Sequence, residues 1–146
     1  MEIKLKIIKL EHNISLPAYQ TEGSSGMDLA AAINEEITLN PLERKLIPTG
    51  IKIELPKGYE AQIRARSGLS IKHGITLINA VGTIDEDYRG EICVGLVNLS
   101  NEPYTIKPND RIAQMVIAEV TKAKIEVTTE LTDSVRASGG FGSTGY

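Results

Sequence analysis

The chain has 146 residues, the length of one ordinary domain, and can bury about two-thirds of its unfolded surface. A formal net charge of -3 provides no broad basic surface, so no nucleic-acid partner is expected. The single cysteine, Cys93, excludes an intramolecular disulfide and a cysteine-based zinc site. The first residues alternate without a long apolar run, so neither a signal peptide nor a membrane segment is expected, and a reduced, cytoplasmic compartment fits.

Alternating apolar and polar residues predict short strands from the start of the chain. Apolar residues alternate with lysines over residues 3–7, and a similar alternation recurs over residues 51–55. Residues 59–66 alternate as well, after a turn signal at residues 56–58. We therefore expect residues 51–66 to form a β-hairpin with one apolar and one polar face.

Turn signals recur so often that the chain has room for few long helices. Turns are expected at Asn40-Pro41 and at Pro108-Asn109-Asp110. One short helical turn is expected from Gly68 to His73, with Ser67 near its start.

Two segments are apolar on both faces, over residues 92–97 and 112–118. A half-exposed strand would alternate, so these segments are either central strands or strands whose second face is covered by another subunit.

Aromatic residues make up only 4% of the chain and tryptophan is absent, so the core must be aliphatic. Short β-branched segments between Gly/Pro turns predict an all-β sandwich or jelly roll.

Two segments combine small residues with a charge. Residues 24–31 hold Asp28 among serine, glycine and alanine, a composition that is also typical of a tight turn entering a strand. Arg66, Ser67 and Gly68 stand together at the expected start of the helix. Such a group can seat a phosphate, although a capped turn without a ligand has the same composition.

The densest group of polar residues lies between positions 79 and 91. Asp85, Glu86 and Asp87 stand in a row and are followed by Tyr88. An exposed acidic turn needs no function. Asp85, however, follows an apolar residue and leads toward a buried strand. We therefore expect its carboxylate to be partly enclosed, and it is a candidate general base for water.

Gln114 is an amide within an otherwise apolar strand, just behind the charged pair Asp110-Arg111. Buried without a partner, the amide would cost about 1–3 kcal/mol. We expect it to bond to the backbone, to another subunit or to a ligand.

Residues 136–146 are rich in Gly, Ser and Thr, as flexible tails are. They also begin with Arg136 and contain Phe141, the only phenylalanine of the chain. Glycine N–H groups and arginine can bind phosphate, and a phenylalanine ring can stack on a base. The tail is therefore either a solubilising end or a segment that orders on a nucleotide.

In their order along the chain, these five segments closely resemble the five motifs of the trimeric dUTPases. The matching motifs are Ser-Gly-x-Asp-Leu from Ser25, Arg-Ser-Gly-Leu from Arg66, Gly-x-Ile-Asp-x-Asp-Tyr-Arg-Gly from Gly82, Asp-Arg-Ile-Ala-Gln from Asp110 and Arg-x-x-Gly-Gly-Phe-Gly-Ser-Thr-Gly from Arg136. The third and fifth motifs are long and specific. The resemblance extends from Ser25 to Gly145, which is nearly the whole chain.

The resemblance implies an enzyme that converts dUTP and water to dUMP and pyrophosphate with Mg²⁺, limiting uracil in DNA and supplying dUMP for dTMP synthesis. It implies an all-β, distorted jelly roll of the β-clip type with one short helix. A jelly-roll domain over residues 1–132 and a flexible C-terminal arm over residues 133–146 are expected. The arm is exchanged within a homotrimer, and each active site combines the third motif of one subunit, the first, second and fourth motifs of another, and the arm of the remaining one.

The resemblance also implies a role for each motif. Asp85 orients the water that attacks the α-phosphorus, and Tyr88 packs on the deoxyribose. Asn79 and the backbone near Cys93 read the uracil edge in a tight β-hairpin pocket. Asp28 meets the metal through water, while the triphosphate itself chelates Mg²⁺. The implied catalytic residues are Asp85 and Arg136, and the implied substrate-binding residues are Arg66, Ser67, Gly68, Asn79, Gly82, Thr83, Ile84, Asp85, Tyr88, Cys93, Gln114, Arg136, Phe141, Gly142, Ser143 and Thr144.

Departures from the family pattern are small. Met27 stands where an aromatic residue often occurs, Thr83 where an aliphatic residue is frequent, and Ala137 where a glycine commonly follows the tail arginine. None of them removes a catalytic group. Neither Ser67 nor Cys93 has a histidine nearby in the sequence, which gives a covalent mechanism little support.

Two alternatives stay open at this point. The dCTP deaminases and their bifunctional relatives share the fold, but they carry a second arginine four residues after the serine of the second motif, where this chain has Ile71. The other alternative is a non-catalytic β-sandwich that binds a nucleotide or acts as a capsid-like module, with the glycine tail as a linker.

Overall fold

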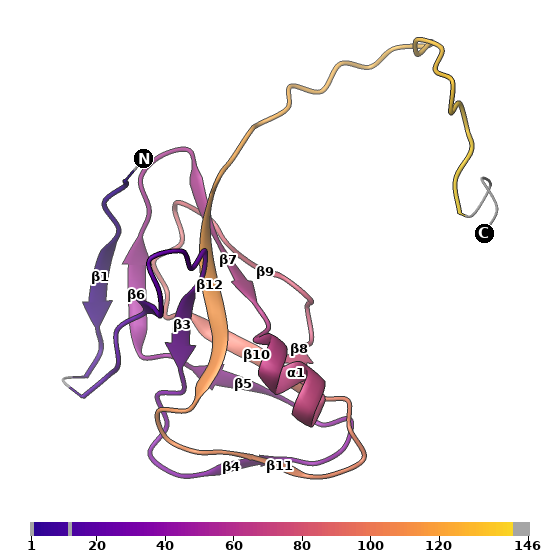
Figure 1. Cartoon of the computed structure of the whole chain (residues 1–146). Helices are drawn as coiled ribbons and strands as arrows, with labels where there is room; N and C mark the ends of the chain where they lie inside the picture. The colour runs from indigo at the N-terminus through magenta and orange to yellow at the C-terminus, as the bar shows by residue number, and fades with distance from the viewer. Residues whose placement is uncertain (1, 12, 142–146) are drawn as a thin grey trace.

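A computed structural model describes residues 2–11 and 13–141 of the chain, and these residues form strands and one short helix (Figure 1). The elements are β1 (Lys6–Lys9), β2 (Ala18–Tyr19), β3 (Met27–Ala30), β4 (Ile37–Leu39), β5 (Arg44–Pro48), β6 (Ile51–Glu54), β7 (Tyr59–Arg64), α1 (Ser67–His73), β8 (Ile75–Leu77), β9 (Gly82–Ile84), β10 (Cys93–Asn98), β11 (Tyr104–Ile106) and β12 (Arg111–Glu119). The predicted all-β, distorted jelly roll with one short helix is confirmed.

The largest sheet of the described residues has the strand order β2-β3-β12-β7-β9. A second sheet has the order β5-β10-β8, and two strand pairs, β1-β6 and β4-β11, complete the fold. Figure 1 shows β12 running through the middle of the molecule between β3 and β7, with α1 beside β8.

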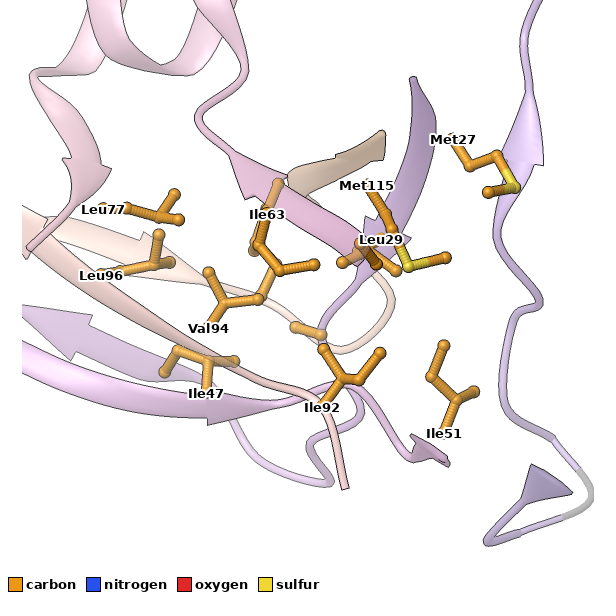
Figure 2. Packing of buried hydrophobic residues seen from close by; sticks show 14 of the residues in the cluster. Met27, Leu29, Ile47, Ile51, Ile63, Leu77, Ile92, Val94, Leu96 and Met115 are labelled. Atoms are coloured by element: carbon orange, nitrogen blue, oxygen red, sulfur yellow. The ribbon is translucent and has the colours of Figure 1, made fainter. Parts of the chain in front are cut away.

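The core lies between the two larger sheets and is aliphatic, as predicted. Figure 2 shows Ile63 and Leu29 from the five-stranded sheet facing Val94 and Leu96 from β10. Each of these side chains is at most 2% exposed. Burial of one such side chain contributes about 1.5–3 kcal/mol, so the contact between the sheets holds the fold together.

Both segments that are apolar on two faces are central strands. β10 lies between β5 and β8, and β12 lies between β3 and β7. Burial on both faces explains why neither segment alternates. Both segments are thus central strands, as one of the two readings of the sequence held; whether another subunit covers the half-buried end of β12 stays a prediction.

The predicted hairpin over residues 51–66 is wrong. β6 pairs with β1, whereas β7 pairs with β12 and β9. The turn itself is present: Gly58 has a φ of 86°, a conformation that favours glycine. Its N–H donates to the carboxylate of Glu86 at 2.6 Å, and its carbonyl accepts from the N–H of Val120 at 2.9 Å. These bonds make the turn a corner between two sheets.

The other local predictions are confirmed. The helix covers Ser67–His73 and ends at Gly74, which has a φ of 67° and donates its N–H to the carbonyls of Leu69 and Ser70. Turns follow Asn40 and Lys107, and Leu42 and Asn109 have positive φ there.

Beyond β12 the chain leaves the folded body, as Figure 1 shows. β12 ends at Glu119, and residues 121–138 have exposed side chains and no strand or helix. Ile125 is 88% and Val127 is 94% exposed. The boundary between domain and arm after residue 132 stays a prediction. Among the described residues, the only helix is α1, which is far too short to cross a membrane.

Asn98 provides a test of the packing between β10 and the strand pair β4-β11. Its fully buried side chain donates to the carbonyls of Leu39 and Glu102 at 2.9 and 2.8 Å and accepts two bonds from Ser100. Asn98→Ala should lower the free energy of unfolding by about 1–3 kcal/mol, because buried carbonyls lose their donor. Chemical denaturation at fixed protein concentration measures this. Ser100→Ala should cost less, and a loss below about 0.5 kcal/mol for Asn98→Ala would contradict the assignment.

Candidate active site

The first, second and fourth motifs line one pocket of about 320 Å³. Its lining residues are Gln20, Ser24, Ser25, Gly26, Asp28, Arg66, Ser67, Gly68 and Gln114. The strand register brings them together, because Gln114 on β12 lies opposite Asp28 on β3 and opposite Arg64 on β7. Arg66 and Ser67 follow directly where β7 ends. Three motifs far apart in the sequence thus meet at one end of three neighbouring strands.

Two arginines hold the carboxylate of Asp28. Arg66 Nε donates to Asp28 Oδ1 at 3.0 Å, and Arg111 Nη1 donates to Oδ2 at 3.2 Å. Arg66 Nη1 also donates to the carbonyl of Arg111 at 3.1 Å. The Asp28 side chain is only 14% exposed, which strengthens these charge-assisted bonds. Arg66 and Asp28 line the pocket, and Arg111 adds a second cation on the same carboxylate. The cluster therefore carries an excess of positive charge, which suits a phosphate group.

The Gln114 amide bonds to the backbone, which was one of the partners expected from the sequence. Its Nε2 donates to the carbonyl of Ala65 at 3.0 Å. A Cβ on Gly26 would collide with Oε1 of Gln114 and lie 3.2 Å from its Cδ. Gly26 is therefore required so that the first and fourth motifs can pack together.

The start of α1 faces open space. Arg66 is the residue that precedes the helix, and it makes no side-chain bond to the first turn. The first N–H groups of a helix lack intrahelical partners, and no acidic side chain occupies this first turn. A Cβ on Gly68 would meet no atom within 4 Å. An anion can therefore approach the backbone of Ser67 and Gly68 closely.

The third motif lines a different pocket, of about 290 Å³. Its lining residues are Tyr59, Glu60, Asp85, Glu86, Asp87, Val120 and Lys122. Asp85 is exposed in the single chain, so the expectation that it is partly enclosed is wrong. β9 is an edge strand of its sheet, and Asp85 directly follows the end of β9, where no further strand covers it.

A closed loop holds Asp85 in place. The N–H of Tyr88 donates to the carbonyl of Asp85 at 3.1 Å, and Arg89 Nη1 donates to the carbonyls of Glu86 and Tyr88 at 2.6 and 2.9 Å. The carboxylate of Glu86 accepts from the corner at Gly58. The acidic residues are therefore not equivalent: Glu86 ties the loop to the sheet, and Asp85 remains free to meet water.

The two pockets lie at opposite ends of β7. Ile84 pairs with Ala61, so Asp85 lies beside Glu60 at the start of β7. Arg66 and Ser67 follow its other end. At about 3.3 Å per residue, the six steps from residue 60 to residue 66 span about 20 Å. One chain alone cannot bring Asp85 and the phosphate pocket onto the same phosphorus atom.

The predicted base-reading residues lie at neighbouring ends of the paired strands β8 and β10, since Leu77 lies opposite Leu96 and the N–H of Ile78 donates to the carbonyl of Gly95 at 2.9 Å. Asn79 lies in the turn after β8, where its Nδ2 would be 3.4 Å from a Cβ on Gly82. Cys93 begins β10 and pairs with Pro48. β8 pairs with β10 and β9 pairs with β7, so the strands that flank Asn79 lie in different sheets, and the hairpin pocket for the base stays a prediction. On β9, Thr83 is exposed and Ile84 is half-buried.

Cys93 is a free, half-buried thiol. Burial and then the negative charge of Glu91 raise the pKa of the Cys93 thiol. It therefore stays protonated at neutral pH, which argues against a role as nucleophile.

The arm places its predicted residues away from both pockets. Arg136 Nε donates to the carbonyl of Gly139 at 2.9 Å, and Phe141 is fully exposed. Ala137 has a φ of 45°, a left-handed conformation that glycine adopts more readily. The predicted residues Gly142, Ser143 and Thr144 lie outside the described residues.

Sequence reasoning missed one residue that lines this pocket, Gln20, and one that bonds to its Asp28, Arg111. Arg111 belongs to the fourth motif and could have been chosen for its charge, but only the fold shows that it bonds to Asp28. Gln20 lines the pocket just after the edge strand β2, and no sequence signal marks it.

Comparisons with known proteins identify the family of the chain. A family model described as dUTPase matches residues 12–145. The chain is 60% identical to the deoxyuridine 5'-triphosphate nucleotidohydrolase of Finegoldia magna over 144 residues, covering 99% of this chain and 100% of that protein. It is 59% identical to the enzyme of that name from Cytophaga hutchinsonii over 145 residues, covering 99% and 94%.

Solved structures share the fold. The dUTPase of Staphylococcus bacteriophage 80alpha with dUpNHpp superposes with a TM-score of 0.88 at 24% identity, covering 98% of this chain and 99% of that chain. A variant of the dUTPase from phage phi11 of S. aureus, which coordinates a structural Mg(II) ion, has a TM-score of 0.80 at 22% identity and covers 90% and 100%. With a family match over nearly its whole length and relatives at about 60% identity, the chain belongs to the dUTPase family.

Proposed function

We propose that this chain hydrolyses dUTP to dUMP and pyrophosphate in active sites that several copies of the chain build together. Family membership supports the reaction, because relatives at 59–60% identity over the whole chain are deoxyuridine 5'-triphosphate nucleotidohydrolases. The chain is thus a dUTP diphosphatase. The observation that carries the shared site is the separation of Asp85 from the phosphate pocket along β7.

A homotrimer would resolve this separation. The third motif of one copy would meet the phosphate pocket of a second copy, and the arm of a third copy would close over both. Most oligomers of identical chains have closed symmetry, so three such composite sites form at once. A site that is incomplete in one chain makes assembly a condition of activity.

The arm needs a surface to cover its apolar side chains. Ile125 and Val127 are almost fully exposed, and they alternate with Lys122, Lys124 and Glu126 as in a strand. A groove of about 710 Å³ on the body offers apolar contacts for the isoleucine and the valine and negative charge for the lysines. It contains the apolar side chains and carboxylates of Ile3, Ile117, Glu2, Glu22 and Glu119. We propose the arm of a neighbouring copy as its occupant.

Asp85 would act as the base in the composite site. An exposed carboxylate next to a rigid turn can hold a water and take its proton as the water attacks the α-phosphorus. Arg66, Ser67 and Gly68 would hold phosphate oxygens, and Gln114 would fix the pocket wall. Arg136 would neutralise charge that develops on the leaving pyrophosphate. Phosphoryl transfer depends on such positioning and charge neutralisation, so no covalent intermediate is needed.

Mg²⁺ is proposed as a metal that arrives with the substrate. Within residues 2–11 and 13–141, no three His, Cys, Asp or Glu side chains cluster to hold an ion. Both oxygens of Asp28 already accept bonds from arginines, so Asp28 suits a contact through a metal-bound water better than direct ligation. Bound to the triphosphate, Mg²⁺ would neutralise phosphate charge.

A nucleotide panel tests the reaction. Incubation with Mg²⁺ and dUTP, dCTP, dTTP or UTP should give pyrophosphate rapidly from dUTP alone, because the proposed site reads both the base and the sugar. Pyrophosphate release and ammonia release are measured in parallel. Ammonia from dCTP would indicate a deaminase instead, and the absence of any hydrolysis would indicate a non-catalytic module.

The role of Asp85 is tested by Asp85→Asn. We expect kcat to fall by about 10²–10⁴-fold, since the amide cannot accept the proton of the attacking water. The Kd of a non-hydrolysable dUTP analogue, measured by calorimetry, should change little. Glu35→Gln, the same type of change on the exposed surface, serves as the control. A near-normal kcat for Asp85→Asn would show that another group is the base.

A further inference from the structure

The ring of Tyr88 lies directly over Gly90. A Cβ on Gly90 would overlap the hydroxyl oxygen of Tyr88 and lie 2.5 Å from its Cζ and 3.0 Å from its Cε2. Real Cβ atoms essentially never approach another heavy atom more closely than 3.0 Å. No side chain at position 90 is therefore compatible with the observed place of the ring.

The backbone gives no other reason for a glycine at this position. Among the described glycines, a positive φ occurs at Gly50, Gly58 and Gly74, and not at Gly90. Position 90 therefore does not need a glycine for a left-handed φ. The ring of Tyr88 is thus the specific obstacle to a side chain there.

Hydrogen bonds hold Tyr88 at both ends. Its N–H donates to the carbonyl of Asp85 at 3.1 Å, and its hydroxyl donates to the carbonyl of Glu91 at 2.9 Å. Glu91 is itself fixed, because its carboxylate accepts from the N–H of Gly50 at 2.9 Å. Tyr88 remains 44% exposed, so one side of the ring is fixed on Gly90 while the other is free to contact a ligand.

We infer that Gly90 is a positioning residue that sets the preference for deoxyribose over ribose through Tyr88. The inference rests on the proposed function and on the role that the family resemblance implies for Tyr88, packing against the sugar of the nucleotide. A ring that cannot move leaves no room for a 2'-hydroxyl. A ring displaced from Gly90, or released from Glu91, can yield space to that hydroxyl.

The test measures kcat/KM for dUTP and for UTP in the full-length assembled enzyme. Gly90→Ala should lower the dUTP/UTP ratio by at least about tenfold, the scale on which a pocket discriminates a single hydroxyl. Tyr88→Phe, which keeps the ring and removes its bond to Glu91, should lower the ratio less. Gly23→Ala is the matched control, because a Cβ there meets no atom within 4 Å. An unchanged ratio for Gly90→Ala would overturn the inference.

A double-mutant cycle separates the inference from the function on which it rests. Tyr88→Ala should remove most of the discrimination, and adding Gly90→Ala should then change the ratio no further. If Tyr88→Ala leaves the ratio intact, the proposed role of Tyr88 fails. If Tyr88→Ala lowers the ratio and Gly90→Ala does not, only the inference fails. If Gly90→Ala alone does not fold, the double variant Tyr88→Ala/Gly90→Ala must fold, because it lacks the ring that blocks the new Cβ. If the double variant does not fold either, Gly90 has a different role and the inference fails.

Discussion

The antiparallel pairing of β7 between β12 and β9 is the constraint on which the rest of the structure depends. Pairing with β12 sets Arg64 opposite Gln114, and Gln114 in turn lies opposite Asp28. Pairing with β9 sets Asp85 beside the other end of the same strand. A slip of one residue would turn every side chain to the opposite face, so the register fixes both pockets at once. The ladder that assembles the pocket around Asp28 and Arg66 also holds Asp85, the proposed base, about 20 Å away from it. In the proposed function, assembly of several copies is therefore part of the chemistry.

Local signals in the sequence predicted local structure well. The helix at Ser67–His73, the turns after Asn40 and Lys107, and the two central strands all follow from composition and periodicity over a few residues. Strand partners were not predictable in this way. Alternation over residues 51–66 shows that each segment has an apolar face, but not which strand lies beside it. The corner at Gly58 sends the two segments into different sheets.

The site was predicted through the order of its motifs. Their joint appearance pointed to the residues around Asp28, Arg66 and Gln114, and the fold brings these together in one pocket. The exposure of Asp85 could not be predicted, because it depends on the edge position of β9 rather than on the apolar residue before it. Gln20 carries no signal at all, since its place in the pocket is set by the short pairing of β2 with β3.

In the proposed function, the arm gains its order from a ligand or a neighbouring copy. Fixing residues 136–141 costs on the order of ten kcal/mol at about 1–2 kcal/mol per residue. Stacking of Phe141 on a base returns about 1–3 kcal/mol, so phosphate contacts must supply most of the remainder. The single bond from Arg136 to Gly139 does not hold the segment to the body. These magnitudes favour an arm that closes when the triphosphate is bound.

The central claim is that the base and the arm of one active site come from different copies of the chain. It is tested most directly by mixing two inactive variants, Asp85→Asn and a chain truncated before Arg136, after joint unfolding and refolding. In a randomly mixed trimer with cyclic symmetry, about a quarter of all sites receive an intact base and an intact arm. The account therefore predicts that the mixture regains about a quarter of the wild-type activity. A mixture that forms mixed trimers and remains as inactive as its two components would contradict the account.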